Sequence, residues 1–228
     1  MATPEEIFSN PFFHSLLTEH AGIAIGSNLA LRFPADVIPF ASLAEATPQA
    51  MQALHDVLAP GERIYVLGDH LPSIPGLTAI HTLPVPQMHP QAPAPPASSE
   101  ITIRSLNASD APAMVHLTDV AFPTFFRPRA HILGDFFGIH HDGELVAMAG
   151  ERIALPGFRE ISALCTHPAH TGKGYAAHLL HHLMRHHAAQ GLKSFLHVSG
   201  SNTRAISLYE RLGFTKTRTV LVHELQRS

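Results

Sequence analysis

The sequence predicts a mixed α/β fold, and three observations lead to this prediction. Its 228 residues, 45% of them hydrophobic, can bury a sizeable core without disulfide or metal cross-links. Runs typical of β-strands recur along the chain, and Asp142-Gly143 between two of them is typical of a tight hairpin turn. The apolar residues between Leu179 and Met184 repeat at three- and four-residue spacing, which indicates an amphipathic helix.

Residues 1–83 are predicted to form a smaller α/β module. Thr47 is suited to cap a helix that Pro60-Gly61 then ends. Nothing in this region has the spacing of a nucleophile, metal or phosphate site, so we expect it to support the rest of the chain or to shape a substrate site. The expected elements are helices over 12–24 and 48–58 and strands over 28–33, 63–67 and 77–83.

A proline-rich segment, residues 84–100, is predicted to be a linker. It holds six prolines between Pro84 and Pro96, and proline favours an extended spacer without backbone donors. The charge changes across it: residues 1–100 carry two Lys or Arg and nine Asp or Glu, and residues 101–228 carry thirteen and nine. This excess of basic residues suits a small polyanionic ligand but is too weak to predict nucleic-acid binding.

Residues 101–228 are predicted to form a second, larger module. Asp110 is suited to cap a helix that reaches about Ala121. A short helix is expected from Asn202, with Gly213 at its end. The expected strands cover 101–104, 135–140, 145–153, 159–166, 193–199 and 219–225, and the long amphipathic helix follows residue 174.

A Gly-x-Gly turn lies between a predicted strand and the long helix, within Thr171 to Ala176. Such a turn leaves several backbone N–H groups unpaired at the positive end of the helix dipole, which is suited to an anion. Glycine also lets a phosphate approach closely. On its own this pattern is also common in ordinary tight turns.

Together with a second motif, this loop resembles the GNAT superfamily of acetyl-CoA-dependent N-acetyltransferases. The family's loop, Gln/Arg-x-x-Gly-x-Gly/Ala, matches Thr171 to Ala176, with Thr171 in place of the long polar residue. The family's Asn-x-x-Ala-x-x-Leu-Tyr-x-x-Leu-Gly-Phe matches Asn202 to Phe214 without a gap. The resemblance covers residues 101–228 and implies a central mixed, mostly antiparallel sheet flanked by helices.

The resemblance implies an enzyme that moves an acetyl or short acyl group from acyl-CoA to a primary amine by direct attack in a ternary complex. The alternative is a non-catalytic acyl-CoA-binding or regulatory module. The loop would bind the CoA pyrophosphate, the strand before it would pair with pantetheine, and Arg204 would meet a phosphate or lie in solvent. The implied cofactor-binding residues are Leu164, Cys165, Thr166, Thr171, Gly172, Lys173, Gly174, Tyr175, Ala176, Asn202 and Arg204.

The implied catalytic residues are Tyr209, Glu160 and Glu151. Tyr209 would protonate the departing CoA thiolate, or else would only pack. The two glutamates, on adjacent predicted strands near the turn 155–158, are the candidates for the base that takes a proton from the amine. Glu160 is favoured because its strand leads to the cofactor loop. The alternative interpretation is that both glutamates are exposed carboxylates near a turn without a catalytic role.

The sequence holds 19 histidines and one cysteine. His178, His182 and His186 are spaced to share a metal, but no Cys or acidic ligand completes the set in sequence, so no metal is predicted. Cys165 is expected to be a packed thiol rather than a nucleophile. A single cysteine, together with an N-terminus unlike a signal peptide, favours a reducing, cytoplasmic setting.

The acceptor is expected to be a small or amino-acid-like amine, with no nucleic-acid or membrane partner. The segment 121–134 is expected to help form its site, because its aromatic residues suit an apolar group and its arginines suit a carboxylate. These residues are Phe122, Phe125, Phe126, Arg127 and Arg129. The sequence leaves the oligomeric state open.

Overall fold

The computed structural model describes residues 3–97, 101–121, 123 and 126–228. In this part of the chain eleven strands form one sheet in the order β1-β2-β3-β4-β11-β5-β10-β9-β8-β7-β6. Neighbouring strands run antiparallel except for the parallel pairs β3–β4 and β9–β10. The strands are β1 Ile25–Gly26, β2 Ala30–Arg32, β3 Phe40–Leu43, β4 Arg63–Leu67, β5 Leu77–Pro90, β6 Arg104–Leu106, β7 Phe136–His141, β8 Glu144–Leu155, β9 Phe158–Thr166, β10 Lys193–His197 and β11 Phe214–Arg227.

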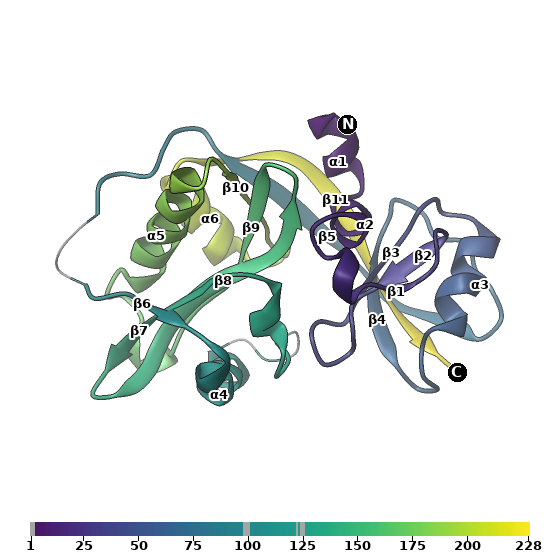
Figure 1. The fold of residues 1–228 in the computed structure, drawn as a ribbon, viewed down its shortest axis with the longest axis horizontal. Helices are drawn as coiled ribbons and strands as arrows, with labels where there is room; N and C mark the ends of the chain where they lie inside the picture. Colours follow the sequence, from purple (N-terminus) through teal and green to yellow (C-terminus); the bar gives the residue numbers. More distant parts are fainter. Residues whose placement is uncertain (1–2, 98–100, 122, 124–125) are drawn as a thin grey trace.

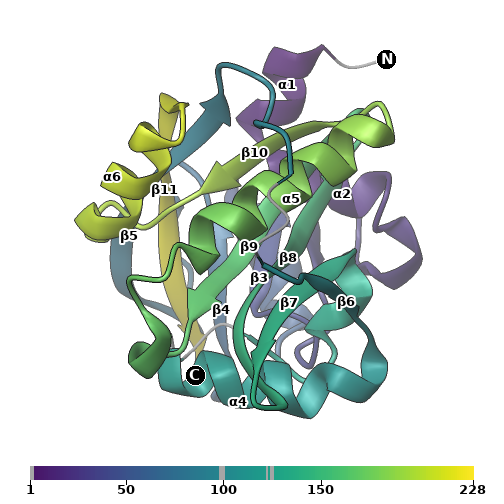
Figure 2. The same ribbon diagram turned by 90° about the vertical axis from the view of Figure 1, so that its left-hand side faces the viewer.

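Helices cover both faces of this sheet, so the predicted mixed, mostly antiparallel sheet flanked by helices is confirmed (Figures 1 and 2). The long helix α5 packs its leucines against Phe137 and Ile139, whereas α4 packs on the other side, against Phe136 and Met148. The helices are α1 Pro4–Ser9, α2 Pro11–Leu17, α3 Pro48–Asp56, α4 Ala111–Ala121, α5 Tyr175–Ala189 and α6 Thr203–Arg211.

Two long strands, β5 and β11, run side by side through both halves of the molecule (Figure 1). At one end β11 pairs with β4, and at the other end β5 pairs with β10. Residues 84–90 of the predicted linker are therefore strand, and residues 98–100 lie outside the described part of the chain.

Two prolines are tolerated in the middle of this sheet because of their spacing. The carbonyls of Pro84 and Pro86 accept hydrogen bonds from the N–H groups of Gly200 and Val198, at 2.8 and 3.0 Å. Alternate residues of a strand direct their backbone groups to the same side. The positions of the two missing N–H groups therefore face β10, where Pro84 and Pro86 only need to accept hydrogen bonds. On the side toward β11, strand β5 keeps its N–H groups.

The chain start differs from the single helix predicted over 12–24. Pro4 and Pro11 each occupy the first turn of a separate short helix, and the side chains of Thr3 and Asn10 cap them. The predicted strand at 101–104 is found later, at Arg104–Leu106, and strand β3 was not predicted. No helix in the described residues is both long and apolar enough to cross a membrane.

Candidate active site

A cavity of about 750 Å³ lies where the two halves of the molecule meet. Its walls come from the glycine loop before α5, from the end of β9, from α6 and from aromatic residues of the N-terminal half. Every residue predicted to bind the cofactor borders this cavity: Leu164, Cys165, Thr166, Thr171, Gly172, Lys173, Gly174, Tyr175, Ala176, Asn202 and Arg204. Residues separated by tens of positions thus share one site.

The cavity opens where β9 and β10 separate. The two strands pair in parallel only as far as Ile161 and Leu196. Beyond this point residues 162–166 of β9 line the cavity. Ala163 has a φ of 51°, and the register with β8 shifts around it, as expected for a β-bulge. Among the described residues, the part of β9 beyond Ile161 is not paired with β10.

The glycine loop presents the start of α5 to the same cavity. Gly172 and Gly174 have φ values of 80° and 76°, a conformation that favours glycine. Gly174 is the N-cap residue of α5 and makes no side-chain cap. A Cβ atom at Gly172 would meet no atom within 4 Å, so there is open space beside the loop. The arrangement provides unpaired N–H groups and a dipole for an anion.

Three basic side chains from the glycine loop and α6 border the cavity. They are Lys173, Arg204 and Arg211. Arg211 was not predicted, although it lies seven residues after Arg204 and therefore on the same face of α6. The three cations complement a ligand with several phosphate groups.

The Tyr209 side chain is 9% exposed and borders the cavity from α6. Burial raises the pKa of its phenol to about 12, which keeps it protonated at neutral pH. The cap of α6 holds this helix in place, since the Asn202 side chain accepts a hydrogen bond from the Ala205 N–H at 3.0 Å. A protonated phenol at a cavity wall is suited to donate a proton to a leaving group.

The two predicted glutamates lie on adjacent strands but on opposite faces of the sheet. Glu151 borders the cavity, and its Oε1 lies 3.0 Å from Nε2 of the buried His187 on α5. Glu160 faces the N-terminal half, is fully buried and does not border the cavity. Glu160 is therefore not placed to take a proton from an acceptor directly.

Glu160 is held by two partners instead. Its Oε2 accepts a hydrogen bond from Nε of Arg152 at 2.9 Å, and its Oε1 accepts one from a terminal nitrogen of Arg152 at 2.5 Å. His197 places Nδ1 2.8 Å from the same Oε1. Burial raises the pKa of Glu160, but the charges and hydrogen bonds of Arg152 and His197 outweigh this and lower it to about 2.

Sequence reasoning missed Arg152 and His197. Both border the cavity, and the His197 side chain is 2% exposed. Among 19 histidines no local spacing distinguishes His197. Its partners lie 37 and 45 positions away in the chain, and only the pairing of β8, β9 and β10 brings them together.

Aromatic residues also border the cavity. Phe12, Phe40 and Tyr65 border it from the N-terminal half, and Phe126 borders it from the segment 121–134. In that segment Arg129 instead pairs with Asp36, and neither it nor Arg127 lines the cavity. Phe122 and Phe125 lie outside the described residues.

The cysteine is buried, and one histidine of α5 has two acidic neighbours. Cys165 packs beside Met148, and burial raises the pKa of its thiol to about 12, which keeps it protonated. His186 does have acidic neighbours, with its Nε2 2.7 Å from Asp135 and one ligand atom each of Asp135, Glu151 and His186 within 4.8 Å. Hydrogen bonds within the protein account for this group.

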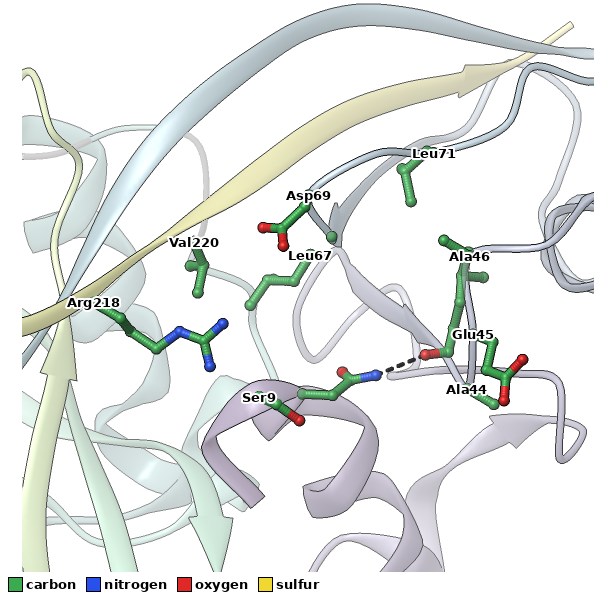
Figure 3. A pocket seen from close by; sticks show the side chains of 12 residues that line it. Ser9, Ala44, Glu45, Ala46, Leu67, Asp69, Leu71, Arg218 and Val220 are labelled. Atoms are coloured by element: carbon green, nitrogen blue, oxygen red, sulfur yellow. Dashed lines mark hydrogen bonds between the residues drawn. The ribbon is translucent and has the colours of Figure 1, made fainter. Parts of the chain in front are cut away.

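A second, smaller cavity of about 120 Å³ lies between α1, the loop after β3 and β11 (Figure 3). Arg218 lines it and donates a hydrogen bond to the Phe8 carbonyl at 2.8 Å. Asn10 also lines it and donates one to the Leu43 carbonyl at 2.7 Å, the dashed line in Figure 3. This cavity is too small for a cofactor.

Comparisons with known proteins agree with this geometry. The FR47-like protein family matches residues 136–222. A solved structure from Novosphingobium aromaticivorans, described as an acetyltransferase of the GNAT family, is 31% identical, covers 97% of this chain and 98% of its own, and has a TM-score of 0.89. The chain belongs to the GNAT family and is a GNAT-type N-acetyltransferase.

Two further proteins resemble this chain, one in its fold and one over part of its sequence. A GCN5-related N-acetyltransferase from Kribbella flavida shares the fold at 16% identity, with 95% of each chain covered and a TM-score of 0.62. A mycothiol acetyltransferase from Streptomyces avermitilis is 36% identical over 93 residues, which are 40% of this chain. The match spans only 30% of the length of that relative.

Proposed function

We propose that the chain transfers an acetyl or another short acyl group from acyl-CoA to a primary amine by direct attack in a ternary complex. The observation that carries this proposal is that the glycine loop, the open edge of β9 and the Tyr209 phenol border one cavity. A non-catalytic acyl-CoA-binding module would not need a protonated phenol at that place.

In this proposal each part of the cavity binds one part of acyl-CoA. The N–H groups of residues 172–176 bind the pyrophosphate at the N-terminus of α5, and Lys173, Arg204 and Arg211 add charge around it. The open edge of β9 at residues 164–166 pairs with the amides of pantetheine. The thioester then lies where β9 and β10 separate, and Tyr209 gives its proton to the sulfur as the C–S bond breaks.

Replacing Gly172 by glutamate (G172E) tests the cofactor site. The new carboxylate repels the pyrophosphate, and a like charge in a binding site costs several kcal/mol, so we expect at least about 100-fold weaker binding of acetyl-CoA by calorimetric titration. G191E is the matched control, because Gly191 also has a positive φ (74°) and open space but lies beyond the far end of α5. Equal affinities of the two variants would contradict the proposed site.

The acceptor is proposed to be a small amine that carries an apolar or aromatic group. This proposal is supported by four aromatic residues that border the cavity: Phe12, Phe40, Tyr65 and Phe126. The partial similarity to a mycothiol acetyltransferase does not extend this to a thiol-sugar acceptor, because it leaves 60% of this chain unmatched.

A panel of amines with acetyl-CoA, followed by CoA release, tests this acceptor class. We expect kcat/KM for 2-phenylethylamine to exceed that for ethylamine by at least about tenfold, since one methylene alone is worth about 10–200-fold in an apolar pocket. A tripeptide with a free N-terminus is the comparison. Turnover of the tripeptide alone would overturn the small-amine proposal and leave acyl transfer intact.

A further inference from the structure

His197 lies at the point where β9 and β10 separate. The last residues paired between these strands are Ile161 and Leu196, and His197 follows directly at the end of β10. Its ring packs between Phe12 and Phe195, with ring centroids 6.3 and 5.8 Å away, and borders the cavity. In the proposed function this is where the thioester lies, so His197 is the titratable ring next to the reacting carbon.

The partner on Nδ1 determines which tautomer this ring adopts. The Glu160 carboxylate accepts hydrogen bonds and, being ionised, has none to donate. Because Nδ1 of His197 lies 2.8 Å from Glu160 Oε1, Nδ1 carries the proton in the neutral ring. The lone pair is then on Nε2.

The Nε2 atom of His197 is buried and bonds to none of the described residues. The great majority of buried polar atoms have a partner, either in the protein or in an ordered water. The Nε2 lone pair is therefore an unused hydrogen-bond acceptor in a residue that borders the cavity, and a bound water or the acceptor would satisfy it on reaching this atom.

Resting on the proposed transfer to an amine, we propose that His197 is the catalytic base that takes the proton of the acceptor, directly or through one bound water. Glu160 is the positioning residue that holds the Nδ1 proton, and Arg152 in turn holds Glu160. A carboxylate that orients a histidine base in this way also stabilises the imidazolium that forms.

The proton balance of the step is complete with these residues. The acceptor enters as an ammonium ion and gives one proton to Nε2 of His197. Its lone pair forms the N–C bond as the C–S bond breaks, and Tyr209 protonates the sulfur. The second nitrogen proton is lost as the amide forms and restores the phenol, and His197 returns its proton to solvent.

The pH dependence of this step follows from the groups that face the ring. Among the described residues these are Glu160 on β9, Arg152 on β8 and His89 on β5. Burial, with a smaller contribution from the charge of His197, lowers the pKa of His89 to about 4, so His89 is already neutral near pH 7. Since His197 borders the cavity and His89 does not, the acidic limb of kcat/KM is the readout that separates the two rings.

The test compares H197Q with H89Q, because both rings pack on Phe195 but only His197 borders the cavity. For the best amine of the panel, H197Q is expected to lower kcat/KM about 10²–10⁴-fold and to remove its acidic limb, with acetyl-CoA affinity retained. Because H197Q also takes one partner from the buried Glu160 carboxylate, the melting temperature is measured to separate lost catalysis from lost folding. H89Q is expected to keep both the rate and the limb. E160Q is expected to lower kcat/KM as well, because an amide no longer fixes the proton on Nδ1 of His197.

A second measurement needs no acceptor. The ¹⁵N spectrum of the histidine rings at pH 7.5, with His197 assigned through H197Q, is expected to show a proton on Nδ1 and none on Nε2. A proton on Nε2, or equal activity of H197Q and H89Q, would overturn the inference alone. A wild-type chain that releases no CoA with any amine would overturn the proposed function and, with it, the role of His197.

Discussion

Replacing Tyr209 by phenylalanine (Y209F) is expected to lower kcat about 10²–10⁴-fold while the affinity for acetyl-CoA stays within about twofold of the wild type. The phenol borders the cavity, and burial raises its pKa to about 12. Without its proton the departing thiolate must leave as an anion or wait for water. The ring packs against Phe214, and phenylalanine preserves that contact.

Steady-state kinetics together with calorimetric titration check this expectation. If Y209F loses affinity for acetyl-CoA in proportion to its loss of kcat, Tyr209 binds the cofactor rather than acting as an acid. If neither quantity changes, Tyr209 only packs in the core, and the proton comes from elsewhere. The melting temperature of Y209F is the control for folding.

The parts of the site that are local in sequence were predictable. The glycine loop and the Asn202 to Phe214 motif are each short, continuous segments, and their spacing follows from turn and helix geometry. The predicted cofactor-binding residues of these two motifs border the cavity for this reason. The hairpin at Asp142-Gly143 was likewise predictable, because the two-residue type I′ turn that joins hairpin strands needs a positive φ at both positions, which favours Asp-Gly.

The parts that depend on strand pairing were not predictable. Prolines at 84 and 86 indicate a linker when read alone, yet they fit β5 because its neighbours need only their carbonyls. Glu151 and Glu160 lie on adjacent strands, as expected. However, the register shift between Glu151 and Ala154 decides which face each side chain takes. No local pattern carries that information.

Replacing Arg152 by methionine (R152M) is expected to lower the free energy of unfolding by about 3–5 kcal/mol, because it leaves the Glu160 carboxylate buried with one partner fewer. The guanidinium also lies over the rings of Phe12 and Phe40, 5.3 and 5.0 Å from their centroids. R129M is the matched control. Arg129 and Asp36 are paired at 3.0 Å but are half-exposed, so a loss of at most about 1 kcal/mol is expected.

The pH dependence of this difference separates lost charge pairing from lost packing. In the wild type the pKa of Glu160 is lowered from 4.5 to about 2, so its ionised form stabilises the fold above pH 4.5, and this contribution is lost as the pH falls toward 2. In R152M the pKa of Glu160 rises, and the carboxyl is neutral over much of that range. The gap in unfolding free energy between wild type and R152M should therefore narrow between pH 4.5 and pH 2. If the difference in unfolding free energy is constant with pH, the stability lost in R152M comes from packing against Phe12 and Phe40. Such a result would also contradict the charge pairing of Arg152 with Glu160 on which the positioning of His197 rests.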